Sequence, residues 1–121
     1  MRFPASHPLV LPVAAAGVRQ NPFLLRRHPG CCAADGRTVF APGEYVISSF
    51  PGNKYGYTTG ASAATAFVSA AAAVLSALRP AAAPGEIRDS LFHGARTFRD
   101  EDGSWRFLSL GGAASRLLGA A

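Results

Sequence analysis

The sequence predicts an α/β fold in a single domain. Three β-rich stretches, residues 8–15, 37–40 and 44–49, precede a long helix over residues 61–78. The helix is predicted because residues 61–78 contain no proline, no glycine and no charge, and are rich in alanine, the strongest helix former. The chain has 121 residues, of which 49% are hydrophobic, so it is long and apolar enough to build one core.

The elements before the helix follow from local composition. Residues 8–15 are an apolar run bounded by proline and glycine, which indicates a buried strand. Residues 17–36 are loop-like, and residues 37–40 and 44–49 predict short strands because they hold β-branched and aromatic side chains. Residues 50–60 are interpreted as a loop whose tight turns are marked by Gly52, Gly56 and Gly60.

The remaining elements are mostly helical. Spacing predicts one continuous apolar face on the long helix, made of Phe67, Ala71, Val74, Leu75 and Leu78. Arg79-Pro80 ends that helix, and a second begins near Pro84, with His93-Gly94 at its end and Arg96 nearby. Residues 100–103 predict a solvated turn, residues 105–108 a short strand and residues 112–118 a terminal helix.

Ser62 falls in the first turn of the long helix. Backbone N–H groups there have no intrahelical partner, and the helix dipole is positive. A hydroxyl in this place either caps the helix or acts as a nucleophile whose developing oxyanion those N–H groups stabilise. The residues alone leave both interpretations open.

Several segments resemble, in order and spacing, the nucleophile region of the subtilisin-like serine peptidases. They are Ala41-Pro42-Gly43, Pro51-Gly52-Asn53-Lys54-Tyr55-Gly56, Gly60-Ala61-Ser62-Ala63-Ala64 and Phe67-Val68-Ser69-Ala70-Ala71-Ala72. Phe3-Pro4-Ala5-Ser6 and the apolar strand after it are similar to the segment that follows the family's oxyanion-hole asparagine. The resemblance implies that residues 1–121 are the C-terminal portion of a three-layer, parallel-sheet peptidase domain. In that fold a buried central helix carries the nucleophilic serine at its N-terminus.

The same resemblance implies the roles of individual residues. Ser62 would be the nucleophile of an endopeptidase that cleaves polypeptides by acyl transfer, and Thr58, Thr59 and Gly60 would bind substrate beside the leaving group. Two residues depart from the family pattern: Ala61 stands where the family has threonine, and Ala66 where it usually has proline. The Ala61 change removes a hydroxyl that in the family assists the oxyanion site.

The family's aspartate and histidine, which precede the serine, have no counterpart in this sequence. His7 and His28 each precede a proline in loop-like sequence, and Asp35 lacks a flanking strand. His93 follows the serine and is expected at the surface. We therefore expect the partner of this chain to be the missing N-terminal portion of the peptidase domain, and the chain alone to be inactive and poorly stable.

Two other functions remain open at this stage. A non-catalytic fragment or pseudo-peptidase acting as an interaction module would explain Ala61 and the missing histidine and aspartate. A small membrane-associated protein would explain the uncharged run over residues 55–78. Small residues dominate that run, however, which favours a helix packed inside a soluble core, so no membrane partner is expected.

Composition narrows the remaining choices. The net charge of +5 is dispersed along the chain, and no aromatic-basic pattern suggests nucleic-acid binding. Cys31 and Cys32 are adjacent, which suits neither a relaxed disulfide nor a zinc site, so we interpret them as small apolar residues and expect no metal or cofactor.

The N-terminus imitates a secretory signal, but its three prolines favour the strand predicted over residues 8–15 instead. The compartment stays open, although the resemblance implies an exported protein.

Overall fold

The computed structural model describes residues 2–18, 25–29 and 36–119 of the chain. Its elements are β1 (Val13–Val18), β2 (Leu25–Arg27), β3 (Val39–Pro42), β4 (Val46–Phe50), β5 (Lys54–Thr58), α1 (Ala61–Leu78), α2 (Pro84–His93), β6 (Arg96–Asp100), β7 (Gly103–Phe107) and α3 (Leu110–Leu117). The predicted α/β class is confirmed, and α1 has the predicted bounds. Cys31, Cys32 and Asp35 lie outside the described residues.

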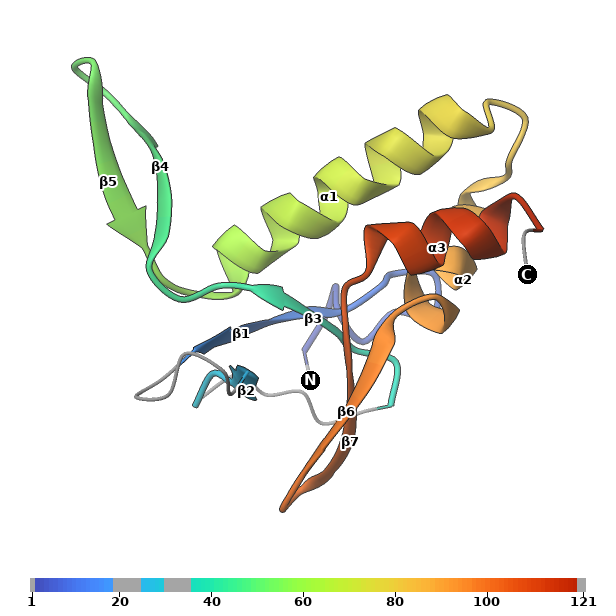
Figure 1. Cartoon of the computed structure of the whole chain (residues 1–121), viewed down its shortest axis with the longest axis horizontal. Helices are drawn as coiled ribbons and strands as arrows, with labels where there is room; N and C mark the ends of the chain where they lie inside the picture. The colour runs from blue at the N-terminus through green and yellow to red at the C-terminus, as the bar shows by residue number, and fades with distance from the viewer. Residues whose placement is uncertain (1, 19–24, 30–35, 120–121) are drawn as a thin grey trace.

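The strands form two separate sheets (Figure 1). The larger has five strands in the order β2-β1-β3-β7-β6. Its central pairs, β1 with β3 and β3 with β7, are parallel, whereas β2 and β6 close the two edges in antiparallel pairing. Strands β4 and β5 form a hairpin that projects away from the rest of the molecule and leads into α1 (Figure 1).

Strand alternation gives the large sheet two different apolar faces. Ala15, Val39 and Ala41 lie under the helices, in one core cluster with residues of α1, α2 and α3. Ala14, Ala16 and Phe40 point the other way and pack with Trp105 in a second cluster. All three helices therefore cover the same face (Figure 1), and mainly aromatic side chains cover the other.

The buried stripe of α1 is rotated from the predicted one. Ala64, Val68, Ala71 and Leu75 are buried, so the prediction was right for Ala71 and Leu75 only. Phe67, Val74 and Leu78 are 42%, 43% and 49% exposed. The contacts of the helix explain the rotation, because its alanines face alanines on β1 and β3, and small side chains let the two backbones approach closely.

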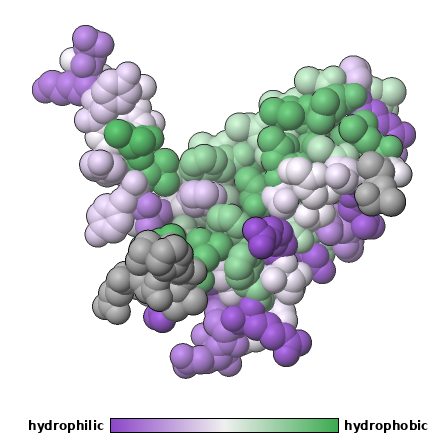
Figure 2. All heavy atoms as spheres, viewed as in Figure 1, coloured by the Kyte–Doolittle hydropathy of each residue, from purple (hydrophilic) through white to green (hydrophobic). Residues whose placement is uncertain are grey.

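The outer side of α1 is consequently apolar and open. Figure 2 shows hydrophobic residues gathered over this helix. By length and composition alone, α1 is the one helix in the described part of the chain that could cross a membrane. Core helices of soluble proteins meet the same criterion, and the buried stripe of α1 packs on the sheet in that manner.

Several strand predictions needed correction. Strand β1 begins at Val13 rather than at residue 8, because the preceding proline-rich segment forms turns, with the His7 N–H donating to the Pro4 carbonyl at 2.9 Å. The presumed loop over residues 50–60 contains β5, which the turn residues Gly52 (φ 81°) and Asn53 (φ 58°) fold back onto β4. Helix α2 ends at His93, as predicted, but strand β6, which contains Arg96, was not predicted.

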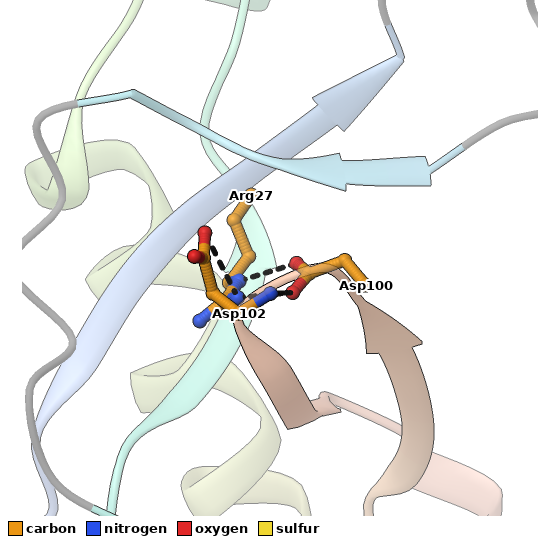
Figure 3. A network of polar contacts seen from close by, with 3 residues as sticks. All are labelled: Arg27, Asp100 and Asp102. Carbon is orange, nitrogen blue, oxygen red and sulfur yellow. Dashed lines mark hydrogen bonds and ion pairs between the residues drawn. The ribbon is translucent and has the colours of Figure 1, made fainter.

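An ion-pair network joins the two edges of the large sheet. Arg27 of β2 donates from Nε to Asp100 Oδ2 at 2.7 Å, and its Nη2 contacts Asp100 Oδ1 (Figure 3). Asp102 lies 3.8 Å from the same guanidinium. Because β2 and β6 are the first and last strands of the sheet, the sheet curls far enough for its two edges to meet on the helix-free face, where the guanidinium also lies over the Phe40 ring.

The network makes stability depend on acid pH. Hydrogen bonding from Arg27 holds the pKa of Asp100 below its usual 3.8. A carboxyl whose pKa is lowered by folding stabilises the folded state above its ordinary pKa, and this stability is lost as the pH falls through the folded-state value. We expect acid unfolding of Asp100→Asn, followed by circular dichroism, to lose the part of the pH dependence that lies below about pH 3.8.

The matched control for this test is Glu101→Gln, which removes an exposed carboxylate from the same turn. Identical acid-unfolding curves for Asp100→Asn and Glu101→Gln would contradict the role given to the Arg27 contact.

Candidate functional site

The first turn of α1 contains Ser62, and no side chain caps this end of the helix. The residue in the N-cap position is Gly60. Ser62 is exposed, and its hydroxyl makes no hydrogen bond with any residue that the structure describes. The alternative in which Ser62 merely caps the helix is therefore wrong. Its hydroxyl is left available to a ligand.

The first turn of α1 offers an anion site beside that hydroxyl. The N–H groups of Ala61, Ser62 and Ala63 have no acceptor within the helix, because intrahelical bonding starts four residues in. The first turn contains no acidic side chain that would offset the positive end of the dipole. A carbonyl oxygen gaining negative charge next to Ser62 would be stabilised by these groups.

A short series of backbone hydrogen bonds connects this turn to the sheet. The Gly43 N–H donates to the Ala16 carbonyl at 2.9 Å, and the Gly43 carbonyl accepts from the Gly60 N–H at 2.7 Å. Both glycines are required by geometry. A Cβ on Gly43 would lie 2.3 Å from Ala15 Cβ and 2.8 Å from the Gly60 carbonyl oxygen, and Gly60 has φ 143°.

The predicted substrate-binding residues lie together at the base of the hairpin. Thr58 is exposed and ends β5 opposite Val46. Thr59 is also exposed, and its Oγ1 accepts a hydrogen bond from the Tyr45 N–H at 2.9 Å. Gly60 follows directly before the helix. All three residues shortly precede Ser62 in the chain. The Thr59 hydroxyl already accepts the hydrogen bond that holds the base of the hairpin.

No histidine is hydrogen-bonded to Ser62 within the described residues. His7 Nδ1 accepts from the Leu9 N–H at 3.1 Å. His93 is exposed at the end of α2, which confirms it as a surface residue. His28 instead lies against Glu44, with 2.6 Å between Nδ1 and Oε1. The part of the chain that the structure describes also holds no group of three or more potential metal ligands.

Sequence reasoning missed the His28–Glu44 pair. The two residues are 16 positions apart, and only the folding of β2 alongside β1 brings them together. One signal was present, since Glu44 is the only acidic residue between Asp35 and Glu86. A lone carboxylate in an apolar stretch indicates a specific partner.

Comparison with known proteins agrees with this geometry. The sequence profile described as the Subtilase family matches residues 3–113. The chain belongs to the subtilase family. Among curated proteins no significant match was found.

Several solved structures resemble this subtilase chain over most of its length. The prenylagaramide maturation protease PagA is 25% identical, with a TM-score of 0.81 over 98% of this chain and 46% of its own. Fervidolysin from Fervidobacterium pennivorans, a keratinolytic enzyme related to subtilisin, is 27% identical, with a TM-score of 0.80 over 93% of this chain and 20% of its own. The A-subunit of the AB5 toxin from E. coli is 25% identical, with a TM-score of 0.69 over 87% of this chain and 37% of its own. The chain thus spans less than half the length of these structures.

The close contact of Gly43 with Ala15 and Gly60 can be tested by substitution. We expect Gly43→Ala to destabilise the chain by about 1–3 kcal/mol, because the added methyl would overlap Ala15 and the Gly60 carbonyl in a packed site. Gly111→Ala is the matched control, since nothing lies within 4 Å of its added Cβ and alanine favours helix α3 by up to about 1 kcal/mol. Urea unfolding measures both changes, and equal stability of the two variants would contradict the close contact.

Proposed function

We propose that residues 1–121 are the C-terminal, nucleophile-bearing portion of a subtilase peptidase domain that cleaves polypeptides. The observation that carries this proposal is the placement of Ser62. Its hydroxyl is exposed and unbonded among the described residues, and it stands in a helix turn that already has a glycine cap. A hydroxyl beside unpaired backbone N–H groups is the arrangement that acyl transfer requires.

The proposed reaction proceeds through an acyl-enzyme. Ser62 Oγ forms a bond to the scissile carbonyl carbon while a base takes the hydroxyl proton, and the base returns that proton to the leaving amine. The Ser62 N–H and the first turn of α1 hold the oxyanion. Thr58, Thr59 and Gly60 would lie along the substrate beside the leaving group.

The base, its orienting carboxylate and the second oxyanion donor would come from an N-terminal portion of the domain. Two observations support this division. The chain covers 37–46% of the toxin A-subunit and the PagA structure. In addition, the outer side of α1 carries exposed apolar residues, and a helix that is apolar all round is normally buried. The chain alone would therefore lack peptidase activity.

A non-catalytic interaction module is the second candidate. It is favoured by Ala61, which removes a side-chain donor from the oxyanion site, and by the lack of a histidine bonded to Ser62 among the described residues. The two functions differ in the reactivity of Ser62. A module would need no reactive serine.

Chemical rescue tests the proposal. We expect a fluorophosphonate probe to label Ser62 of the purified chain at a rate that rises with added imidazole, because free imidazole replaces the missing base. Peptide mapping by mass spectrometry locates the label. Hydrolysis of a peptide by the chain without imidazole would contradict the claim that the chain lacks a base for Ser62.

Two variants control this experiment. Ser62→Ala should abolish the imidazole-dependent label, whereas Ser69→Ala, which changes an exposed serine of the same helix, should keep it. Labelling of Ser62 no faster than that of Ser69 at every imidazole concentration would overturn the proposed function in favour of an interaction module.

A further inference from the structure

Glu44 is a buried carboxylate in a position where burial is costly. Its side chain is 4% exposed, and its Oε1 lies 2.6 Å from His28 Nδ1, whose side chain is 28% exposed. Removing a carboxylate from water costs several kcal/mol unless charged or hydrogen-bonding groups compensate it. A buried carboxylate with a specific partner can hold the backbone on either side of it in one position.

The pair lies on the face of the sheet that carries the helices. The His28 N–H donates to the Ala15 carbonyl at 2.9 Å, which places His28 beside Ala15 on the neighbouring strand. Ala15 belongs to the cluster under α1, and cross-strand neighbours share a face. Gly17 lies on the same face two residues further along β1, and a Cβ there would be 2.4 Å from Glu44 Oε2. Glu44 is thus enclosed between β1 and the chain that follows β2.

The residues on either side of Glu44 hold the two residues that precede the α1 helix. The Gly43 carbonyl accepts from the Gly60 N–H at 2.7 Å. The Tyr45 N–H donates to Thr59 Oγ1 at 2.9 Å. The segment 43–45 therefore supports the entry to α1 from both of its ends, and the Glu44 side chain anchors the middle of that segment.

This segment needs an anchor because its backbone is strained. Tyr45 has φ 50°, a left-handed conformation that non-glycine residues adopt rarely and at some cost. Its side chain is 76% exposed, so packing of the tyrosine ring does not impose the conformation. Glu44, the residue before Tyr45, contacts His28. This contact links the segment to the end of β2, which lies two strands away from β3 in the sheet.

We propose that Glu44 and His28 are positioning residues for the nucleophile. Their contact fixes residues 43–45, these fix Thr59 and Gly60 through the two hydrogen bonds above, and Gly60 sets the start of the helix that carries Ser62. The catalytic part of this inference rests on the proposed function of Ser62. The structural part concerns the entry to α1 and is measured separately.

Amide hydrogen exchange of the full chain, followed by NMR, tests the link. In Glu44→Ala the amides of Gly60 and Tyr45 should exchange about tenfold faster, the loss expected for one hydrogen bond to a charged group. The Leu108 amide, which donates to the Phe40 carbonyl at 2.8 Å in the sheet, should keep its rate. Glu44→Gln retains an acceptor for His28 and should restore most of the protection.

Three further variants make the test specific. His28→Ala should accelerate the same two amides, and the acceleration in the double variant His28→Ala with Glu44→Ala should be smaller than the two single effects combined, because the single variants both lose the Glu44–His28 contact. Glu101→Ala removes an exposed carboxylate and should leave all these amides unchanged.

Several outcomes would overturn the inference. Uniform acceleration that includes the Leu108 amide would mean that Glu44 contributes only general stability, and unchanged exchange at Gly60 would mean that the contact does not reach the helix. Imidazole-dependent labelling of Ser62 should also slow in Glu44→Ala and recover in Glu44→Gln. Failure of the unmodified chain to label would overturn the proposed function alone, since the exchange rates do not depend on reactivity.

Discussion

The 2.7 Å hydrogen bond from the Gly60 N–H to the Gly43 carbonyl connects the sheet of this subtilase chain to its long helix. Gly43 is itself hydrogen-bonded to β1, so backbone hydrogen bonds alone fix the position of the helix N-terminus relative to the sheet. Backbone contacts of this kind tolerate little displacement, and a side chain on Gly43 would occupy the space of both Ala15 and Gly60. The exposure of Ser62 agrees with this arrangement, because Gly60 occupies the N-cap position and the serine hydroxyl is not used to cap the helix.

The rest of the fold supports the joint from both faces of the sheet. Under α1, alanines of the helix meet alanines of β1 and β3, which brings the helix close to β1 and to the end of β3, directly before Gly43. On the opposite face the sheet curls until Arg27 of β2 reaches Asp100 of β6, and the aromatic cluster of Phe40 and Trp105 lies beneath this contact. The outer side of α1 and the projecting hairpin retain large exposed apolar groups, including Phe67, Val74 and Tyr45. These surfaces are where a further part of a peptidase domain would pack.

The sequence predicts the parts of this structure that depend on local chemistry. An uninterrupted alanine-rich run defined α1, and Ser62 was placed in its first turn for the same reason. Features set by tertiary contact were missed. Strand β5 depends on left-handed turn residues that pair it with β4, and the buried side of α1 depends on which residues let the helix approach the sheet. The His28–Glu44 pair depends on the register of β2 against β1, which the sequence between two residues 16 positions apart does not reveal.

The central claim is that a backbone joint, rather than side-chain capping, sets the position of the proposed nucleophile. Scalar coupling across hydrogen bonds, measured by NMR between the Gly60 amide nitrogen and the Gly43 carbonyl carbon, tests it most directly. The account predicts a resolved coupling, comparable to that between Leu108 and Phe40 in the sheet, where the donor–acceptor distance is 2.8 Å. A coupling for Leu108 with none for Gly60 would show that the helix start is not held by Gly43, and would contradict the account.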